Sequence, residues 1–191
     1  MSENAFPMNP PRGPAPARRP RQPTLRFMLS HPAHLVALGF GCGLSPIAPG
    51  TVGTLWAWLG YVLLDPALSD AQWGVLIAVG IPVGWWSATV AARNLGIADP
   101  ASVVIDEVLA FWCVLWLVMP AGLWGQAVAF ALFRFYDAAK PGPVGWADRR
   151  FKLRRGVTIG WSQGFGILLD DAVAALCTLL TIALWQRLWP W

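Results

Sequence analysis

Residues 73–92, WGVLIAVGIPVGWWSATVAA, form an apolar run that contains no charged side chain. A helix that crosses the hydrocarbon core of a membrane needs about 20 residues, so this run is long enough to span. The whole chain has the same character, because 56% of its 191 residues are hydrophobic and 13% are charged. A soluble domain carries about 25% charged residues. The sequence therefore predicts an integral membrane protein.

Four further apolar segments lead us to expect the all-α class, as a polytopic membrane helical bundle with four or five membrane helices. They are residues 51–68, 103–119, 123–136 and 168–189. Asp65-Pro66 should close the first segment, and Pro82 should kink the 73–92 helix. The two middle segments are short, so we expect a hairpin that is tilted or only partly inserted. Residues 35–38 are too short to span and should lie at the interface or re-enter.

The N-terminal segment is predicted to be a disordered cytosolic tail. It contains PMNPPRGPAPARRPRQP, which is basic and proline-rich and offers nothing to bury. Its arginines attract anionic lipid head groups and bias this end to the cytoplasm, and no apolar region follows closely enough for a cleaved signal peptide. We place the tail at residues 1–30 and a membrane-embedded helical domain at residues 31–191. His31 and His34 are expected at the surface, and the three cysteines lie too far apart for a disulfide framework or a zinc site.

A glycine-rich segment, GFGCGLSPIAPGTVGT, occupies residues 39–54 and contains no charge. Glycine and proline disfavour regular elements, and the simplest explanation is a turn between two apolar elements. A turn needs only four residues, however. We therefore predict a loop that presents backbone N–H groups to an anion, at Gly50 and beside the hydroxyls of Ser45, Thr51 and Thr54.

Two acid pairs lie in otherwise apolar segments: Asp106-Glu107 in SVVIDEVLAFWCVLW and Asp170-Asp171 in GFGILLDDAVAAL. Acids at membrane depth are costly and usually mark a functional site. The alternative is that each pair begins a helix, where acids favour the N-terminal dipole. Neighbouring side chains point about 100° apart, so each pair should send one carboxylate to the centre and the other outward. Carboxylates without histidine or thiol partners favour Mg²⁺.

A third constellation is FRFYDAAKPGP, residues 133–143. Arg134, Asp137 and Lys140 are spaced three apart, which would place them on one helix face. Taken alone, Arg134 and Asp137 are best explained as an ion pair at the end of a helix. Beside two acid pairs and a glycine loop, they are better explained as a phosphate clamp that a carboxylate positions.

The charges predict which side of the membrane these features share. With the N-terminus inside, the 93–107 and 134–167 connections both return to the cytoplasmic side. The second connection is rich in lysine and arginine, as the positive-inside rule expects. The glycine-rich segment follows the cytosolic tail directly. We therefore expect this segment and the acids to face the cytosol together.

Four blocks resemble one known family: GFGCGLSPIAPGTVGTL, DPASVVIDEVLAFW, FRFYDAAKPGPVGWADRR and GFGILLDDAVAA. They occur in the same order and spacing as the signature blocks of the phosphatidylglycerophosphatase A family, over about residues 35–180. The resemblance implies a Mg²⁺-dependent lipid phosphatase, multi-pass in the bacterial inner membrane, with its site facing the cytosol. Such an enzyme hydrolyses phosphatidylglycerophosphate to phosphatidylglycerol and phosphate. Departures from the family pattern occur at Cys42, Ala110, Gly142, Ala175 and Ser162-Gln163.

The expected roles follow from the residues and the resemblance together. Asp106, Glu107, Asp170 and Asp171 would hold one or two Mg²⁺ and, with Asp137, act in catalysis, while Arg134, Lys140 and the glycine-rich segment would bind phosphate. No cysteine is followed by an arginine six positions later and no DxD motif occurs, which argues against cysteine-nucleophile and aspartyl-phosphate enzymes. A non-catalytic membrane protein and another lipid head-group phosphomonoesterase are the alternatives. The expected partners are membrane lipids, without nucleic acid.

Overall fold

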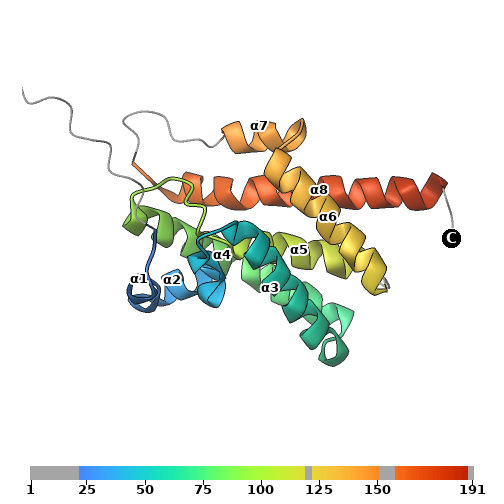
Figure 1. Cartoon of the computed structure of the whole chain (residues 1–191), viewed down its shortest axis with the longest axis horizontal. Helices are drawn as coiled ribbons and strands as arrows, with labels where there is room; N and C mark the ends of the chain where they lie inside the picture. Colours follow the sequence, from blue (N-terminus) through green and yellow to red (C-terminus); the bar gives the residue numbers. More distant parts are fainter. Residues whose placement is uncertain (1–21, 119–121, 151–157, 189–191) are drawn as a thin grey trace, which may run out of the picture.

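The computed structural model describes residues 22–118, 122–150 and 158–188, and within these ranges every regular element is helical (Figure 1). The elements are α1 (Leu25–Leu29), α2 (Pro32–Ala37), η1 (Gly39–Leu44), α3 (Pro49–Leu64), η2 (Asp65–Ala67), α4 (Asp70–Leu95), α5 (Ile105–Val118), α6 (Leu123–Ala139), α7 (Pro143–Arg150) and α8 (Trp161–Leu188). The expected all-α class is confirmed for this part of the chain.

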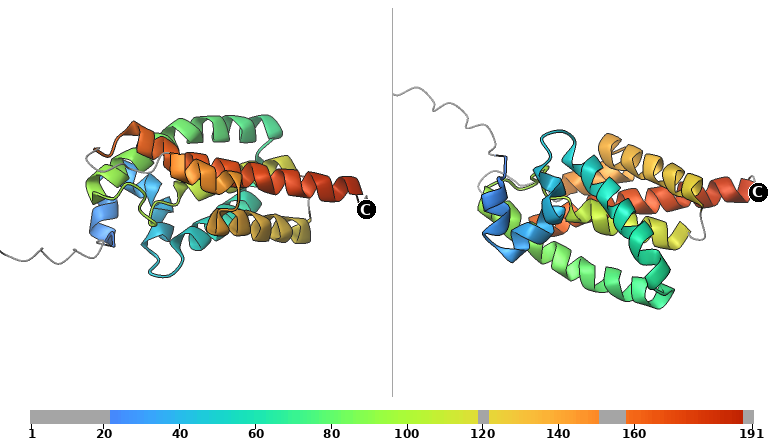
Figure 2. Two further views of the ribbon diagram at one scale, coloured as in Figure 1. Left: turned by 90° about the horizontal axis from the view of Figure 1, so that it is seen from above. Right: turned by 60° about the horizontal axis from the view of Figure 1, so that its bottom comes forward.

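Helices α5 and α8 form the centre of the bundle. Helix α5 packs against α3, α4 and α8, and α8 also contacts α4, α6 and α7 (Figure 2). The ring of Phe111 in α5 is fully buried and lies 5.5 Å from the ring of Phe133 in α6. The indole N–H of Trp112 donates to the carbonyl oxygen of Ala57 at 2.8 Å, which ties α5 to α3.

The helix boundaries follow the apolar runs of the sequence. Helix α4 contains residues 73–92 and continues through Pro82. It begins where the backbone N–H of Ser69 donates to Gln72 Oε1 at 2.8 Å, and it ends at Gly96, whose φ of 70° is left-handed. Helices α5 and α6 match the expected segments closely, and η2 follows α3 where Asp65-Pro66 is expected to close it.

Two expected boundaries are wrong. The last helix begins at Trp161 rather than residue 168, and α3 begins at Pro49 rather than residue 51, so the predicted glycine loop ends there. Helix α8 continues through Gly164. A Cβ at this position would lie 1.9 Å from Thr89 Oγ1 of α4. Glycine at this position therefore lets α4 and α8 approach closely. Pro49 starts α3 because its ring fixes a helical φ and the first turn needs no N–H donor.

Helices α1 and α2 pack at the N-terminal end of the described chain. Helix α1 begins at Leu25, before the domain boundary expected at residue 31. The surface position expected for His34 is wrong, since its side chain is buried between α1 and α4. Its Nδ1 atom lies 2.9 Å from the carbonyl oxygen of Phe27, and its Nε2 atom lies 2.7 Å from Asn94 Nδ2.

Two of the described helices, α4 and α8, are long and apolar enough to cross a membrane on their own. They contain 26 and 28 residues with mean hydropathy 1.7 and 2.1, whereas α3, α5 and α6 are shorter than a full span of about 20 residues. Only 33% of the apolar window of α8 is buried inside the protein. Large apolar side chains are exposed on all four of the longest helices, which favours association with a membrane: Leu59, Leu63, Val75, Val79, Val128, Phe135, Leu180 and Leu184. A count of four or five membrane helices stays a prediction.

Candidate active site

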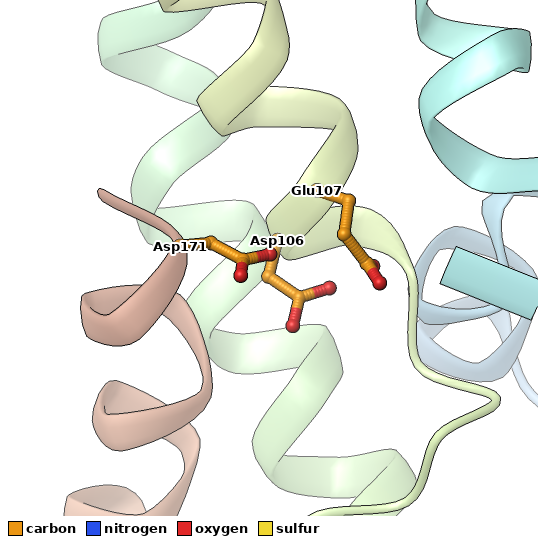
Figure 3. Close-up of side chains that lie close together, drawn as sticks. All are labelled: Asp106, Glu107 and Asp171. Carbon is orange, nitrogen blue, oxygen red and sulfur yellow. The ribbon is translucent and has the colours of Figure 1, made fainter. Parts of the chain in front are cut away.

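Three carboxylates converge between α5 and α8. Asp106, Glu107 and Asp171 each offer one ligand atom, and these atoms lie within 4.8 Å of one another (Figure 3). One oxygen of each residue, Asp106 Oδ1, Glu107 Oε2 and Asp171 Oδ2, is buried and makes no hydrogen bond to the described residues. Three like charges in such proximity repel one another and lose their hydration. The cluster therefore requires protons or a cation.

The two helices place these acids in different ways. Asp106 and Glu107 lie in the first turn of α5, where the helix dipole favours negative charge. Asp170 and Asp171 lie in the interior of α8, well beyond its first turn at Trp161, so the expectation that they begin the last helix is wrong. The N-terminus of α8 itself is therefore too distant to stabilise the carboxylate of Asp171, which is only 3% exposed.

The expectation that each pair divides its carboxylates between centre and periphery is confirmed for one pair. On α8, Asp171 joins the cluster and Asp170 pairs with Lys140. On α5, both Asp106 and Glu107 reach the cluster (Figure 3), so the expected division is wrong for this pair.

Lys140 links three helices rather than sharing a face with Arg134 and Asp137. It adopts a left-handed conformation with a φ of 45° at the C-terminal end of α6. From there its ammonium donates to Asp148 Oδ1 of α7 at 2.6 Å and to Asp170 Oδ2 of α8. Burial lowers the pKa of Lys140, but its hydrogen bonds to Asp148 and Asp170 outweigh that effect and raise the pKa above its usual value. Lys140 therefore stays charged at physiological pH.

Arg134 and Asp137 form the ion pair that their spacing predicts, through Nη1 and Oδ2. The same Nη1 atom lies 3.5 Å from Thr54 Oγ1, so the guanidinium connects α6 to α3. The side chains of Arg134 and Asp137 are 18% and 13% exposed, and the charge of Asp137 acts on both Glu107 and Asp171. The pair consequently belongs to the acid cluster rather than to the outer surface.

The glycine-rich segment reaches the cluster at Gly50, in the first turn of α3. A Cβ at this position would lie 2.2 Å from Glu107 Oε1 and 3.4 Å from Arg134 Nη1. Thr54 Oγ1 donates to the carbonyl oxygen of Gly50 at 2.8 Å, and Thr51 lies beside Gly50 in the same turn. Helix α3 therefore brings its N-terminal turn close to Glu107, and the N-terminal turn of a helix is where anions bind.

The first half of the glycine-rich segment lies differently. Ser45 donates its hydroxyl hydrogen to the carbonyl oxygen of Ile47 at 2.8 Å, in an exposed turn. Its hydroxyl thus closes the turn before α3 instead of joining the acids. Cys42 lies half-buried in η1, and burial raises the pKa of its thiol, which keeps it protonated.

Two further acids, Asp99 and Asp148, lie near the cluster. The residues expected from the sequence to form the site did not include them. The charge of Asp99 acts on both Asp106 and Asp170, and Asp148 pairs with Lys140. Asp148 lies in the basic stretch ADRR, whose pattern indicates an exposed surface helix, and Asp99 precedes a proline in a connection. The signal that could have found them is the clustering of acids on the predicted cytosolic connections.

The family of the chain follows from comparison with known proteins. A family model described as Phosphatidylglycerophosphatase A matches residues 35–186. Phosphatidylglycerophosphatase A of Escherichia coli (strain K12) is 34% identical over 166 residues, which cover 86% of this chain and 90% of that protein. The protein of the same name from Haemophilus influenzae is 32% identical over 161 residues, which cover 84% and 92%.

A further relative, from Bacteroides thetaiotaomicron, has a name that proposes a phosphatidylinositol-3-phosphatase. It is 34% identical over 157 residues, covering 78% of this chain and 90% of that protein. No solved structure matches the chain. The family model covers most of the sequence, including every residue of the acid cluster. The chain therefore belongs to the phosphatidylglycerophosphatase A family.

Proposed function

We propose that this chain hydrolyses phosphatidylglycerophosphate to phosphatidylglycerol and phosphate, with Mg²⁺ held by Asp106, Glu107 and Asp171. The observation that carries the proposal is a cluster of three carboxylates that each offer a ligand oxygen within 4.8 Å of the others. Each of the three also has one buried oxygen without a hydrogen-bond partner among the described residues. Membership of the family supports the choice of substrate.

The donor set fits a hard divalent cation. All three ligand residues offer carboxylate oxygens, which Mg²⁺ prefers, and neither a histidine nor a cysteine belongs to the cluster. A cation at this position would relieve the repulsion among three buried like charges. When bound, Mg²⁺ supplies charge neutralisation of the phosphomonoester and lowers the pKa of an attacking water.

The remaining residues bind and orient. The guanidinium of Arg134 is aimed at the cluster by Asp137, and its planar fork matches two non-bridging phosphate oxygens. The N-terminal turn of α3 at Gly50 offers backbone N–H groups beside Glu107. Lys140 holds Asp148 and Asp170 in place, and we assign it a positioning role next to the phosphate site.

We place the protein in the bacterial inner membrane as a multi-pass protein with the site facing the cytosol. Helices α4 and α8 have the length and composition of spans. Basic side chains of α7, including Arg149 and Arg150, lie near the site at Lys140, which fits the cytoplasmic bias of positive charge. Helices α1 and α2 gather at the end of the bundle where α8 begins, and the α3–α4 connection lies at the opposite end (Figure 2).

Phosphate release by the purified protein in detergent micelles tests the function. We expect turnover of phosphatidylglycerophosphate in Mg²⁺, no turnover after EDTA, and recovery when Mg²⁺ is restored. Full activity in EDTA would refute the proposed requirement for Mg²⁺. No phosphate release under any condition would favour a non-catalytic role for the acids.

A second candidate substrate class has one specific observation in its favour, the name of the Bacteroides thetaiotaomicron relative. The same assay therefore includes phosphatidylinositol 3-phosphate and phosphatidic acid at equal mole fraction. We expect the highest kcat/KM on phosphatidylglycerophosphate. A higher kcat/KM on either of the other lipids would assign the chain to another lipid phosphomonoesterase activity.

A further inference from the structure

An apolar groove runs from the acid cluster along α8, between α4 and α5. Its volume is about 400 Å³. The side chains that line it are apolar, including Ile81 of α4, Cys113 of α5 and Leu179 of α8, with one exception. The exception is Asp106, which belongs to the cluster of Figure 3. The groove is therefore continuous with the proposed catalytic site.

Helices α4 and α5 pack closely beside this groove. Cβ atoms at Gly80 and Gly84 would lie 2.5 and 2.6 Å from the Leu109 side chain, so the two glycines allow Leu109 to lie close against α4. Small side chains line the opposite side, at Ala110 on α5 and Ala175 on α8. Small residues on α5 and α8 therefore leave room in the groove, while the two glycines let α4 pack closely on α5 beside it.

The groove opens on the apolar outer surface of the bundle. Ile81 and Leu176 line it and are 48% and 54% exposed, so its rim faces the lipid in a membrane-embedded protein. On α8 the lining residues run from Phe165 to Leu179, which is about 21 Å at 1.5 Å per residue, and the part beyond Asp171 is about 12 Å long. The hydrocarbon of one leaflet is about 15 Å thick, half of a core of about 30 Å.

We infer that this groove binds one acyl chain of the phospholipid substrate and thereby sets the position of the phosphomonoester at Asp106. The inference rests on the proposed function for the identity of the lipid. A chain in the groove lies parallel to α8 with its glycerol end at the carboxylates and its methyl end near Leu179. Because the surrounding lipid is as apolar as the groove, the gain is in orientation of the substrate rather than in hydrophobic burial.

A cross-linking experiment tests binding without requiring turnover. The full-length protein in EDTA is irradiated with phosphatidylglycerophosphate that carries a diazirine in the middle of one acyl chain, and the labelled residues are mapped by mass spectrometry. We expect label around Cys113 and residues 172–179, reduced at least fivefold by excess dioleoyl phosphatidylglycerophosphate. Uniform label over the exposed surface, or label that the competitor does not reduce, would overturn the inference.

A kinetic experiment uses side chains that fill the groove. Cys113→Phe fills its far end, and Ala183→Leu on the exposed face of α8 is the matched control. We expect Cys113→Phe to lose at least tenfold in kcat/KM on dioleoyl phosphatidylglycerophosphate, yet to stay within threefold of the parent on the deacylated, water-soluble head group. The control should change neither value.

The outcomes separate the groove from the chemistry. Equal effects of Cys113→Phe on both substrates, or no effect on either, would refute the acyl-chain site while the proposed reaction stands. A parent enzyme that releases no phosphate from any lipid would refute the proposed reaction, and the cross-linking map would then decide alone whether a lipid chain occupies the groove.

Discussion

Asp171 is deeply buried and lies close to several other acids. Its side chain is 3% exposed, its Oδ2 atom makes no hydrogen bond within the described residues, and the charges of Asp106, Asp137 and Asp170 all act on it. Such an arrangement destabilises the folded protein unless a cation compensates. A substitution of Asp171 should therefore change the thermal stability of the protein as well as its kcat.

We expect Asp171→Asn to lose at least tenfold in kcat and, in EDTA, to melt at a higher temperature than the parent. The neutral amide removes one repelling charge, and 1 kcal/mol corresponds to about 2–4 °C for a chain of this size. The thermal midpoint is measured with and without Mg²⁺, with Asp70→Asn at the exposed start of α4 as control. Equal stabilisation of parent and Asp171→Asn by Mg²⁺ would show that Asp171 does not bind the ion.

A substitution at Arg134 distinguishes a structural ion pair with Asp137 from a phosphate-binding role. We expect Arg134→Lys to lose about a hundredfold in kcat, because removing a transition-state contact costs roughly 3 kcal/mol and lysine cannot reproduce the planar fork. Membrane expression should stay near normal, and Arg149→Lys, at an exposed position of α7, is the control. A lysine variant within a few-fold of the parent would leave Arg134 as a staple between α6 and α3.

The acids of the site were predictable from sequence, whereas the partners of Lys140 were not. Asp106 and Asp171 interrupt apolar runs, where only a function justifies their desolvation. Lys140 is itself the left-handed residue at the end of α6. This conformation turns its side chain away from Arg134 and toward α7 and α8. A three-residue spacing cannot show that the helix has already ended.

At the scale of elements, long uninterrupted apolar runs were the most predictable part of the fold. Helix α4 follows from its run alone, and so does α5. The start of α8 did not follow, because Gly164 and Gly166 disfavour a helix locally while the close packing on α4 requires a glycine at position 164. The Gly160 N–H donates to Gln163 Oε1 at 2.8 Å, and this capping hydrogen bond marks the start of α8.

Helix α3 provides a matched pair of glycines for testing its approach to the site. We expect Gly50→Ala to lose at least tenfold in kcat, because its Cβ would displace the carboxylate of Glu107. Gly60→Ala should keep full activity, since its Cβ meets Trp112 at an ordinary 3.5 Å. The measurement is kcat at saturating Mg²⁺, with circular dichroism to check helix content. Full activity in Gly50→Ala would remove α3 from the site.

The arrangement of the whole molecule predicts labelling from two sides. Single cysteines at exposed positions near the site, replacing Ile47, Ala101 or Trp146, should react with an impermeant maleimide only from the cytosolic side. A cysteine replacing Ala67, at the α3–α4 connection, should react only from outside. The background carries serine at 42, 113 and 177. Labelling of the 101 and 146 positions from opposite faces would contradict a single site.

The place of Asp171 along α8 bears on how the protein meets its substrate. Ten residues separate it from Trp161, which is about 15 Å of helix, whereas the polar layer on one side of a bilayer is roughly 5–8 Å deep. In the proposed membrane placement, with Trp161 at the cytosolic surface, the carboxylates would lie below the layer of head groups. At that depth the protein would meet its substrate by lateral diffusion within one leaflet. We therefore expect the rate to depend on the fraction of substrate among the surrounding lipids, and the dephosphorylated lipid to leave within the same leaflet.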